Sequence, residues 1–356
     1  MLATFGIGAG IGALFFTTSS FIGLLTNFSV KWWLGKFGQL KSLYLSLILY
    51  ILGASLLGLS AILGLWAQFA AAFFIGMGST GIGITINVLT ANSVRAEQRG
   101  KALSGLHAMY ALAALIVPVI IGIGDRWGLS WDKYFYFAAF MTIFLAAKTF
   151  SHLKNHPVAA KESAESEEKF DWKKFLPYAL LFGFYVAGEV LTSTRLSFYL
   201  QKGASLSEEV SRSILFRYFL FFFLGRVAFI FINVKKYTFH ILQITLVFAI
   251  TNFIAGIYLS PWYFPFAGLG MSVFFPLAMD MISDRFSKDK EAAVSFIFLF
   301  VGIMISTFHF SFGQIVERWG LMFSILLIPL LHFVCYLILL TLKPRKVSKG
   351  LLDRFI

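Results

Sequence analysis

Hydrophobic residues along this chain of 356 residues form long continuous runs that are separated by short polar stretches. An apolar run of about 20 residues is long enough to cross a bilayer as an α-helix. The runs lack the alternating pattern of strands in a membrane barrel. The pattern therefore predicts an all-α integral membrane protein with eleven helices, near residues 10–33, 42–64, 66–91, 102–124, 133–152, 176–200, 211–233, 238–259, 261–283, 292–313 and 320–342.

Composition agrees with a lipid environment. Hydrophobic residues make up 58% of the chain and charged residues 13%, whereas soluble domains are about 25% charged. The 43 Phe and 30 Gly residues also suit membrane helices, which tolerate glycine and carry interfacial aromatic side chains. We therefore expect the lipid bilayer to be the main partner of this protein.

The net charge of +13 would also suit a nucleic-acid partner, but its placement argues against one. Basic residues concentrate in alternate gaps between the apolar runs: Lys31, Lys36, Lys41, Arg95, Arg99, Lys101, Lys235, Lys236, Arg285, Lys288, Lys290 and the tail from Lys343. Cytoplasmic loops of membrane proteins carry such an excess of Lys and Arg. These gaps are thus predicted to be cytoplasmic, and the charge indicates topology rather than nucleic-acid binding.

The longest polar segment, KNHPVAAKESAESEEKFDWKK at 154–174, divides the chain. Its Glu, Lys, Ser and Ala content is typical of a solvated linker. We expect a five-helix N-terminal bundle over 1–152, a cytoplasmic linker over 153–175, a six-helix C-terminal bundle over 176–343 and a cytoplasmic tail over 344–356.

The two halves resemble each other. GMGSTGIG, from Gly76, corresponds to GLGMSVFF, from Gly268, and DRWGL at 125–129 corresponds to ERWGL at 317–321; the offset is 192 residues in both cases. Parallel repeats with a solute site between them are a transporter architecture. The helix at 176–200 has no counterpart after Met1, so we expect an upstream first helix, without which the N-terminal bundle is incomplete.

Motifs for other chemistry are absent or in the wrong context. GMGSTG formally matches a dinucleotide-binding pattern, which requires a preceding strand; inside an apolar helix, small residues instead favour close helix packing. The histidines have no metal-ligand spacing, and no HExxH, CxxC, GxSxG or Walker lysine motif occurs. Cys335 lies in an apolar run, as a buried thiol would. We predict no cofactor, no metal and no enzymatic activity.

Glu189 is the strongest single candidate for function. It lies near the middle of the run at 176–200, where a charged side chain costs roughly 2.5–3.5 kcal/mol on insertion scales. Such a carboxylate either takes part in transport or forms a buried pair that fixes packing. By depth alone, Arg217 on the next helix is its expected partner, roughly 7 Å nearer the outer face, whereas Arg226 lies roughly 10 Å nearer the inner face.

Other intramembrane polar residues have less specific signals. Arginines near helix ends often extend to the interface, which suits Arg195 best and Arg217 and Arg226 less well. His107 and Tyr110 lie one turn apart and share a helix face. Pore lining and ordinary helix contact both remain open for this pair.

Several segments resemble the major facilitator superfamily, and in particular its fucose-permease-like sugar transporters. WLGKFGQLK at 33–41 resembles the loop after the second helix of that superfamily. INVLTANSVRAEQRGKALSGLHAMYALAALIVP at 86–118 and FYVAGEVLTSTRLSFYL at 184–200 resemble the fourth-to-fifth and seventh helices of the branch, and FFFLGRV and FAGLGMSVFFPLAMDMISDRF its eighth and tenth. The resemblance implies the major facilitator fold, with two pseudo-symmetric helix bundles.

The resemblance, together with the positions of charged residues inside the apolar runs, suggests roles for residues. Asn87, His107, Tyr110, Glu189, Arg195 and Arg217 are candidates for solute binding or proton coupling, and Lys36, Gly38, Arg226 and Asp280 for conformational gating. The chain departs from the branch in several places: Gly35 replaces a loop aspartate, Ala111 and Ala113 replace glycines, Arg195 replaces a tryptophan and Gly83 replaces a glutamate. Coupling through the two carboxylates of the branch therefore does not carry over, and Glu189 is the matching acid that remains.

These observations together predict a monomeric secondary transporter in a bacterial-type inner membrane. It would move a small polar solute, foremost a sugar, by alternating access and in symport with protons. Alternatives are transport of an anionic solute, such as a sugar acid or a carboxylate, for which Arg195 and Arg217 supply positive charge, and drug efflux. A third alternative is a non-transporting or inactive truncated membrane protein.

Overall fold

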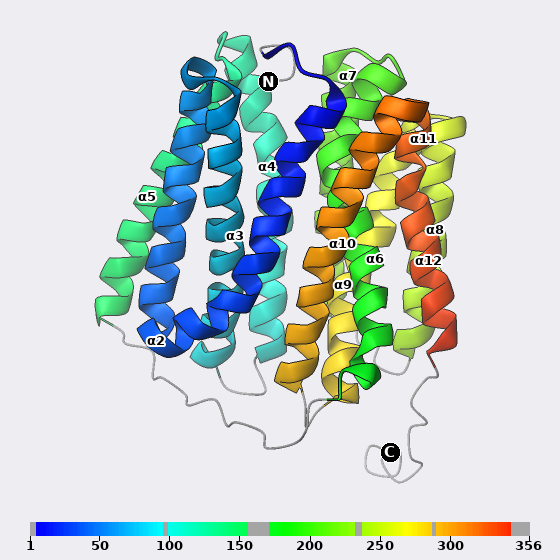
Figure 1. Cartoon of the computed structure of the whole chain (residues 1–356). Helices are drawn as coiled ribbons and strands as arrows, with labels where there is room; N and C mark the ends of the chain where they lie inside the picture. Colours follow the sequence, from blue (N-terminus) through cyan, green and yellow to red (C-terminus); the bar gives the residue numbers. More distant parts are fainter. Residues whose placement is uncertain (1–4, 95–98, 156–170, 232–236, 287–289, 343–356) are drawn as a thin grey trace.

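The computed structural model describes residues 5–94, 99–155, 171–231, 237–286 and 290–342. Its long helices run side by side and reverse direction at each turn (Figure 1). No strand occurs in these ranges. The helices are α2 (Ala9–Leu63), α3 (Leu65–Ser93), α4 (Arg99–Arg126), α5 (Trp131–Asn155), α6 (Trp172–Phe198), α7 (Glu208–Phe231), α8 (Thr238–Tyr258), α9 (Phe264–Arg285), α10 (Lys290–Trp319), α11 (Leu321–Ile325) and α12 (Leu327–Thr341), with the short elements η2 (Tyr199–Gly203) and η4 (Pro261–Tyr263).

Ten segments of these helices are long and apolar enough to span a membrane. Two of them lie in α2, and one comprises α11 and α12 together. Helix α7, which contains three arginines, also runs the length of the bundle (Figure 1). This confirms the predicted all-α membrane fold, with eleven crossings in the described part of the chain.

Helix α2 contains the first two predicted helices. The predicted loop at 34–41 is tighter than expected, because the helical turns continue to Gly38, where the chain reverses. Gly38 has φ 77° and ψ 168°, a conformation that residues with a Cβ atom rarely adopt. The glycine therefore permits the sharp turn between the two crossings.

The two ends of the bundle are defined by the turns. At the upper end of Figure 1, α4 is followed by α5 and α6 by α7. At the lower end, α5 ends at Asn155 and α6 begins at Trp172. The names upper end and lower end are used in this sense below.

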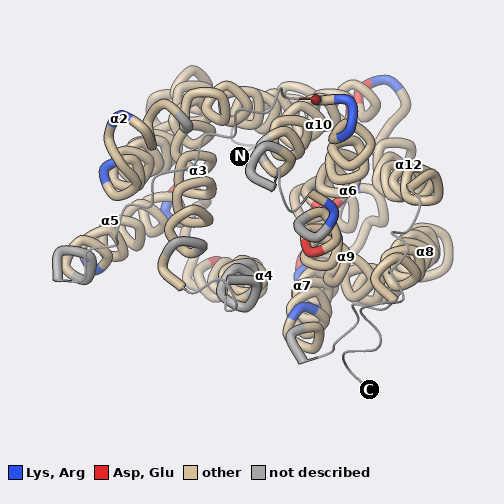
Figure 2. Tube along the Cα trace, turned by 90° about the horizontal axis from the view of Figure 1, so that it is seen from below, with Lys and Arg blue, Asp and Glu red and all other residues tan. Residues whose placement is uncertain are grey.

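The helices form two groups. In the first group, α2 packs against α3 and α5, and in the second, α10 and α12 pack against α6, and α9 against α7 and α8. The most extensive contacts between the groups join α2 with α10 and α4 with α7. Figure 2, seen from the lower end, shows these groups side by side and few charged positions along their helices. The predicted domain boundaries around 153–175 fall mainly outside the described residues and stay a prediction.

The offset of 192 residues also relates the helices of the two groups. Shifted by this offset, α4 covers 291–318, which coincides with α10 at Lys290–Trp319. The glycines of the GMGSTG segment have matching environments. A Cβ atom on Gly76 would meet the Ser19 carbonyl oxygen at 2.3 Å, and one on its counterpart Gly268 would meet the Tyr218 carbonyl oxygen at 2.6 Å. The segment serves close helix packing, as its apolar context indicated.

We expect Gly76→Ala to lower the stability of the fold by about 1–3 kcal/mol, because the new methyl group would overlap the backbone of α2 and force the helices apart. Thermal unfolding of the purified protein in detergent measures this effect. Gly83→Ala is the matched control on the same helix, since a Cβ atom there would meet nothing within 4 Å. An equal loss of stability in both variants would contradict the packing role of Gly76.

The repeated motif at 125–129 and 317–321 ends a helix in both halves, each time before a glycine with positive φ. Helix α4 ends before Gly128, with φ 71°, and α10 ends before Gly320, with φ 82°. The backbone N–H of Leu129 donates to the carbonyl of Gly124 at 3.0 Å, which is the closing bond of a Schellman cap. The motif therefore ends both helices at the upper end of the bundle and places an acidic residue in the last turn of each.

Candidate functional site

The centre of the second group contains a buried ion pair. Glu189 of α6 accepts a hydrogen bond from Nη2 of Arg226 on α7 at 3.3 Å, and the two side chains are 12% and 7% exposed. The Arg226 Nε–H donates to the Ser272 carbonyl of α9 at 3.4 Å, and its guanidinium lies 4.2 Å from the centre of the Phe222 ring. Three helices thus hold this pair inside an otherwise apolar environment.

The expectation that Arg217 would pair with Glu189 is wrong. Arg217 and Arg226 are nine residues apart in α7, which is about two and a half helical turns, so their side chains leave opposite faces. Arg217 lies on the exposed face and stacks on the Trp262 ring at 4.6 Å. Depth in the membrane was therefore a poorer guide to the partner than the face of the helix.

One oxygen of the Glu189 carboxylate is available for a further hydrogen bond. Its Oε2 atom is buried and has no hydrogen-bond partner among the described residues. The nearby hydroxyl of Tyr185 donates to the Met271 carbonyl. A buried polar atom without a partner is costly, so Oε2 is a natural acceptor for a proton or for a hydroxyl group of a solute.

Tyr110 brings the first group of helices to this pair. The guanidinium of Arg226 lies 5.9 Å from the centre of the Tyr110 ring, and this tyrosine is half exposed. Tyr110 lines a cavity of about 460 Å³. The other residues around it are Ala113, Ala114, Val117, Pro118, Ile121, Ser193, Ser197, Gln201, Glu208, Arg212, Leu215 and Phe219. The cavity therefore lies between α4 of one group and α6 and α7 of the other.

Three candidates from the sequence, Asn87, Lys36 and Asp280, do not join this arrangement. The Asn87 amide donates to the Gly83 carbonyl one turn earlier in α3, at 2.7 Å. Lys36 is exposed and lies 4.7 Å from the Trp32 ring beside the turn at Gly38. Asp280 is exposed near the lower end of α9. The side chain of His107 lies outside the described part of the chain.

Arg195 does not extend to the membrane interface, contrary to the expectation from its position. It is 8% exposed, and its guanidinium lies 4.5 Å from the Phe16 ring of α2 and 5.2 Å from the Phe312 ring of α10. Its Nη2 atom is 3.5 Å from Nδ1 of His309. The contact with α2 explains the burial, because the first group of helices covers this face of α6.

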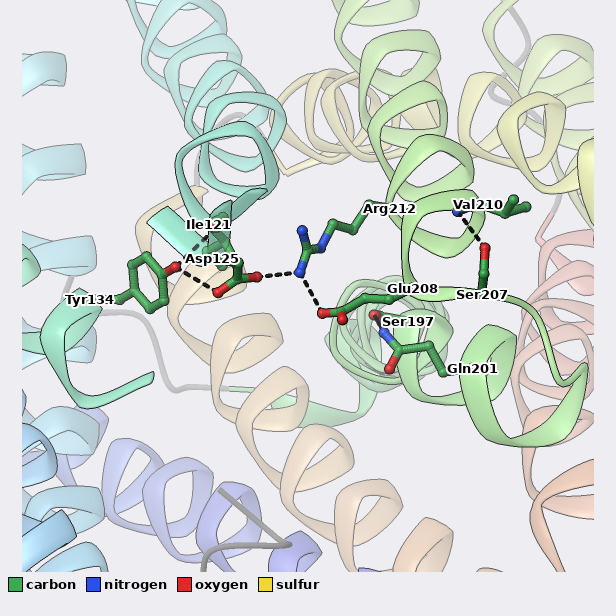
Figure 3. A network of polar contacts seen from close by, with 9 residues as sticks. All are labelled: Ile121, Asp125, Tyr134, Ser197, Gln201, Ser207, Glu208, Val210 and Arg212. Atoms are coloured by element: carbon green, nitrogen blue, oxygen red, sulfur yellow. Dashed lines mark hydrogen bonds and ion pairs between the residues drawn. The ribbon is translucent and has the colours of Figure 1, made fainter. Parts of the chain in front are cut away.

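A cluster at the upper end connects the two groups through charge. Arg212 of α7 pairs with Asp125 of α4 and with Glu208 one turn earlier in its own helix. The Tyr134 hydroxyl of α5 donates to Asp125 at 2.7 Å. Figure 3 shows that these side chains converge between α4, α5 and α7. The cluster escaped the sequence analysis, although the repeated acidic residue of the DRWGL and ERWGL motifs was a signal for it.

The arrangement of these residues fits transport of a solute better than catalysis. A buried ion pair lies beside a cavity between two helix groups, and transporters place their solute sites between two such halves. Groups of His, Cys, Asp and Glu that would bind a metal are not found among the described residues. The fold and the site together define a protein of the membrane-transporter class.

Comparison with known proteins gives the family. The sequence profile of the Major Facilitator Superfamily matches residues 1–305, and the chain belongs to this family, whose members are transporters rather than enzymes. At the level of sequence, no curated protein matches the chain.

Solved structures of this superfamily share the fold. The transporter FucP in its outward conformation has a TM-score of 0.66 at 15% identity, covering 95% of this chain and 91% of that one. The D-xylose–proton symporter has a TM-score of 0.68 at 13% identity, with coverages of 97% and 91%. The human organic anion transporter MFSD10 has a TM-score of 0.70 at 11% identity, with coverages of 93% and 83%. At these identities the likeness concerns the fold alone.

Proposed function

We propose that the protein is a secondary active transporter that moves a small polar solute, foremost a sugar, by alternating access. The observation that carries this proposal is the buried Glu189–Arg226 pair, next to which Tyr110 from the other helix group lies. An intramembrane ion pair is expensive and usually marks a transport pathway. The pair offers acceptors and donors to hydroxyl groups, and the fucose and D-xylose symporters named among the structural neighbours support the choice of a sugar.

Proton coupling would act through Glu189. Its Oε2 atom has no hydrogen-bond partner in the described structure, so a proton can occupy this atom while Oε1 stays bonded to Arg226. Protonation removes the negative charge that holds Arg226 in place, which changes the relative stability of the two conformations. Proton binding and conformational change are then linked by the differential affinity of the two states.

Alternating access would open and close the two contacts between the helix groups. In the described conformation, the ion pair of Asp125 and Arg212 bridges α4 and α7 at the upper end. Because the solute pathway lies between two groups of helices in one chain, a monomer suffices for transport. We propose the inner membrane of a bacterial-type cell as its location, with the lower end in the cytoplasm.

Transport assays in proteoliposomes test this function. We expect fucose or xylose to accumulate at least tenfold when an inward proton gradient is imposed, and to equilibrate without accumulation when a protonophore collapses the gradient. Liposomes without protein give the background. Equal uptake with and without the gradient would contradict proton coupling, and background uptake of every solute under all conditions would contradict transport.

The proposed orientation predicts which cysteines react from outside the cell. Ser130 is exposed at the upper end and Ser93 at the lower end, and the native Cys335 is fully buried. In a Cys335→Ala background, Ser130→Cys should react with an impermeant maleimide in intact cells, whereas Ser93→Cys should react only after the cells are permeabilised. The reverse pattern would place the lower end outside.

A further inference from the structure

Arg195 is a buried cation without an acidic partner among the described residues. Ion pairs of the described residues include Asp132 with Lys133, Asp125 and Glu208 with Arg212, and Glu189 with Arg226. None of them includes Arg195, although its side chain is only 8% exposed. Its Nε atom is buried and has no hydrogen-bond partner in the described structure. The described residues thus offer this side chain no counter-charge, and burial of an uncompensated charge is strongly unfavourable.

The neighbours of Arg195 do not supply that charge. His309 is 2% exposed and contributes a second basic group at 3.5 Å. The rings of Phe16 and Phe312 contact the guanidinium, but a cation–π contact recovers only part of the lost hydration. Glu317 lies two turns further along α10, about 12 Å from His309 by helical rise, and its carboxylate packs against Gly10.

The position of Arg195 makes it accessible to a solute in another conformation. Phe16, which covers the guanidinium, belongs to α2 in the first group of helices, whereas Arg195, His309 and Phe312 belong to the second group. The Phe16 and His309 rings stack at 5.3 Å across this boundary. Separation of α2 from α10 would remove Phe16 from Arg195 and open the guanidinium to the space between the groups.

We propose that Arg195 binds the carboxylate of the transported solute, and that the protein therefore prefers a small hydroxylated acid, such as a sugar acid, over the matching neutral sugar. The guanidinium presents planar donors that match a carboxylate, and the free Nε–H completes a bidentate contact. Glu189 lies on the same helix about 9 Å deeper, where it and Arg226 receive the hydroxyl groups. The inference rests on the proposed transport function and specifies its substrate.

The experiment compares matched acids and neutral sugars. Galacturonate and galactose differ at one carbon, as do glucuronate and glucose. The purified full-length protein is heated with each of the four probes, and the shift of its melting temperature reports binding without any need for transport. Uptake of the same four probes into proteoliposomes is then measured in parallel.

Three variants test whether binding of the acid depends on Arg195. Arg195→Gln removes the charge, Arg195→Lys keeps the charge but loses the planar donors, and Arg318→Gln removes an exposed arginine at the upper end of α10 as the matched control. We expect at least one of the two acids to raise the melting temperature of the wild type and of Arg318→Gln, and its neutral counterpart not to do so. Affinity for the acid should fall at least tenfold in Arg195→Gln and by an intermediate factor in Arg195→Lys.

The outcomes separate the inference from the proposed function. Binding of an acid that depends on Arg195, without uptake of any probe, would support the inference and contradict transport. Uptake of a neutral sugar, with an acid preference that Arg195→Gln leaves unchanged, would support transport and overturn the inference. Absence of a melting shift with all four probes would also overturn it. If Arg195→Gln does not fold, the Arg195→Lys variant decides, since a purely packing role of the cation predicts unchanged affinity there.

Discussion

Replacement of Glu189 by glutamine is expected to abolish proton-driven accumulation of the solute while leaving exchange of solute across the membrane intact. Glutamine keeps the size of the side chain and can still accept a hydrogen bond from Arg226 through its amide oxygen, but it cannot bind or release a proton in the relevant range. Counterflow exchange requires only solute binding and the conformational change. Accumulation should fall at least tenfold, to the level reached with a protonophore, and counterflow should stay within about twofold of the wild type.

The matched control is Glu209→Gln, which removes an exposed carboxylate at the start of α7. This variant should accumulate solute normally. Normal accumulation by Glu189→Gln would instead assign Glu189 to packing alone. Failure of Glu189→Gln to fold would also assign Glu189 to packing, because removing one partner of a buried pair costs roughly 3–5 kcal/mol. The double variant Glu189→Gln with Arg226→Gln removes both charges and, if it restores folding, shows that the unpaired arginine was the cause.

Much of this site could be predicted from the sequence, because charge inside an apolar run is conspicuous. The charge of Glu189 inside an apolar run and its match to the family pattern single it out, and the structure places it in a buried pair. The partner was missed, since depth orders residues along the helix axis but ignores the face from which each side chain leaves. Arg217 lies closer in depth yet on the opposite face, and the long side chain of Arg226 reaches Glu189 from below.

Other features depend on contacts between distant segments, which a single sequence does not reveal. Arg195 resembles a residue that extends to the membrane surface, and only the packing of Phe16 from α2 and Phe312 from α10 explains its burial. The ion pair between Asp125 and Arg212 joins residues 87 positions apart. The repeated motif marked the ends of two helices but did not indicate which helix each acidic residue would face.

The pair of Asp125 and Arg212 should control closure of the upper end. Replacement of Asp125 by arginine sets two positive charges against each other, where the wild type has an attraction between α4 and α7. Both wild-type side chains are partly buried, with 32% and 26% exposure, so screening by solvent reduces the interaction only in part. We estimate that the open conformation gains about 2 kcal/mol relative to the closed one, which is roughly a 30-fold change in their ratio.

Accessibility of the cavity measures this change. Ser197 lines the cavity between α4, α6 and α7, and in a Cys335→Ala background Ser197→Cys reports its exposure to an impermeant maleimide. Introducing Asp125→Arg into this cysteine variant should increase its labelling rate about 30-fold. It should also slow transport, because the upper end no longer closes around the solute. Glu208→Arg is the control, since it places a like charge one turn from Arg212 within the same helix and costs only about 0.5 kcal/mol. If both variants label at the wild-type rate, the ion pair does not contribute to closure; if both increase it equally, the charge of α7 matters but its bridge to α4 does not.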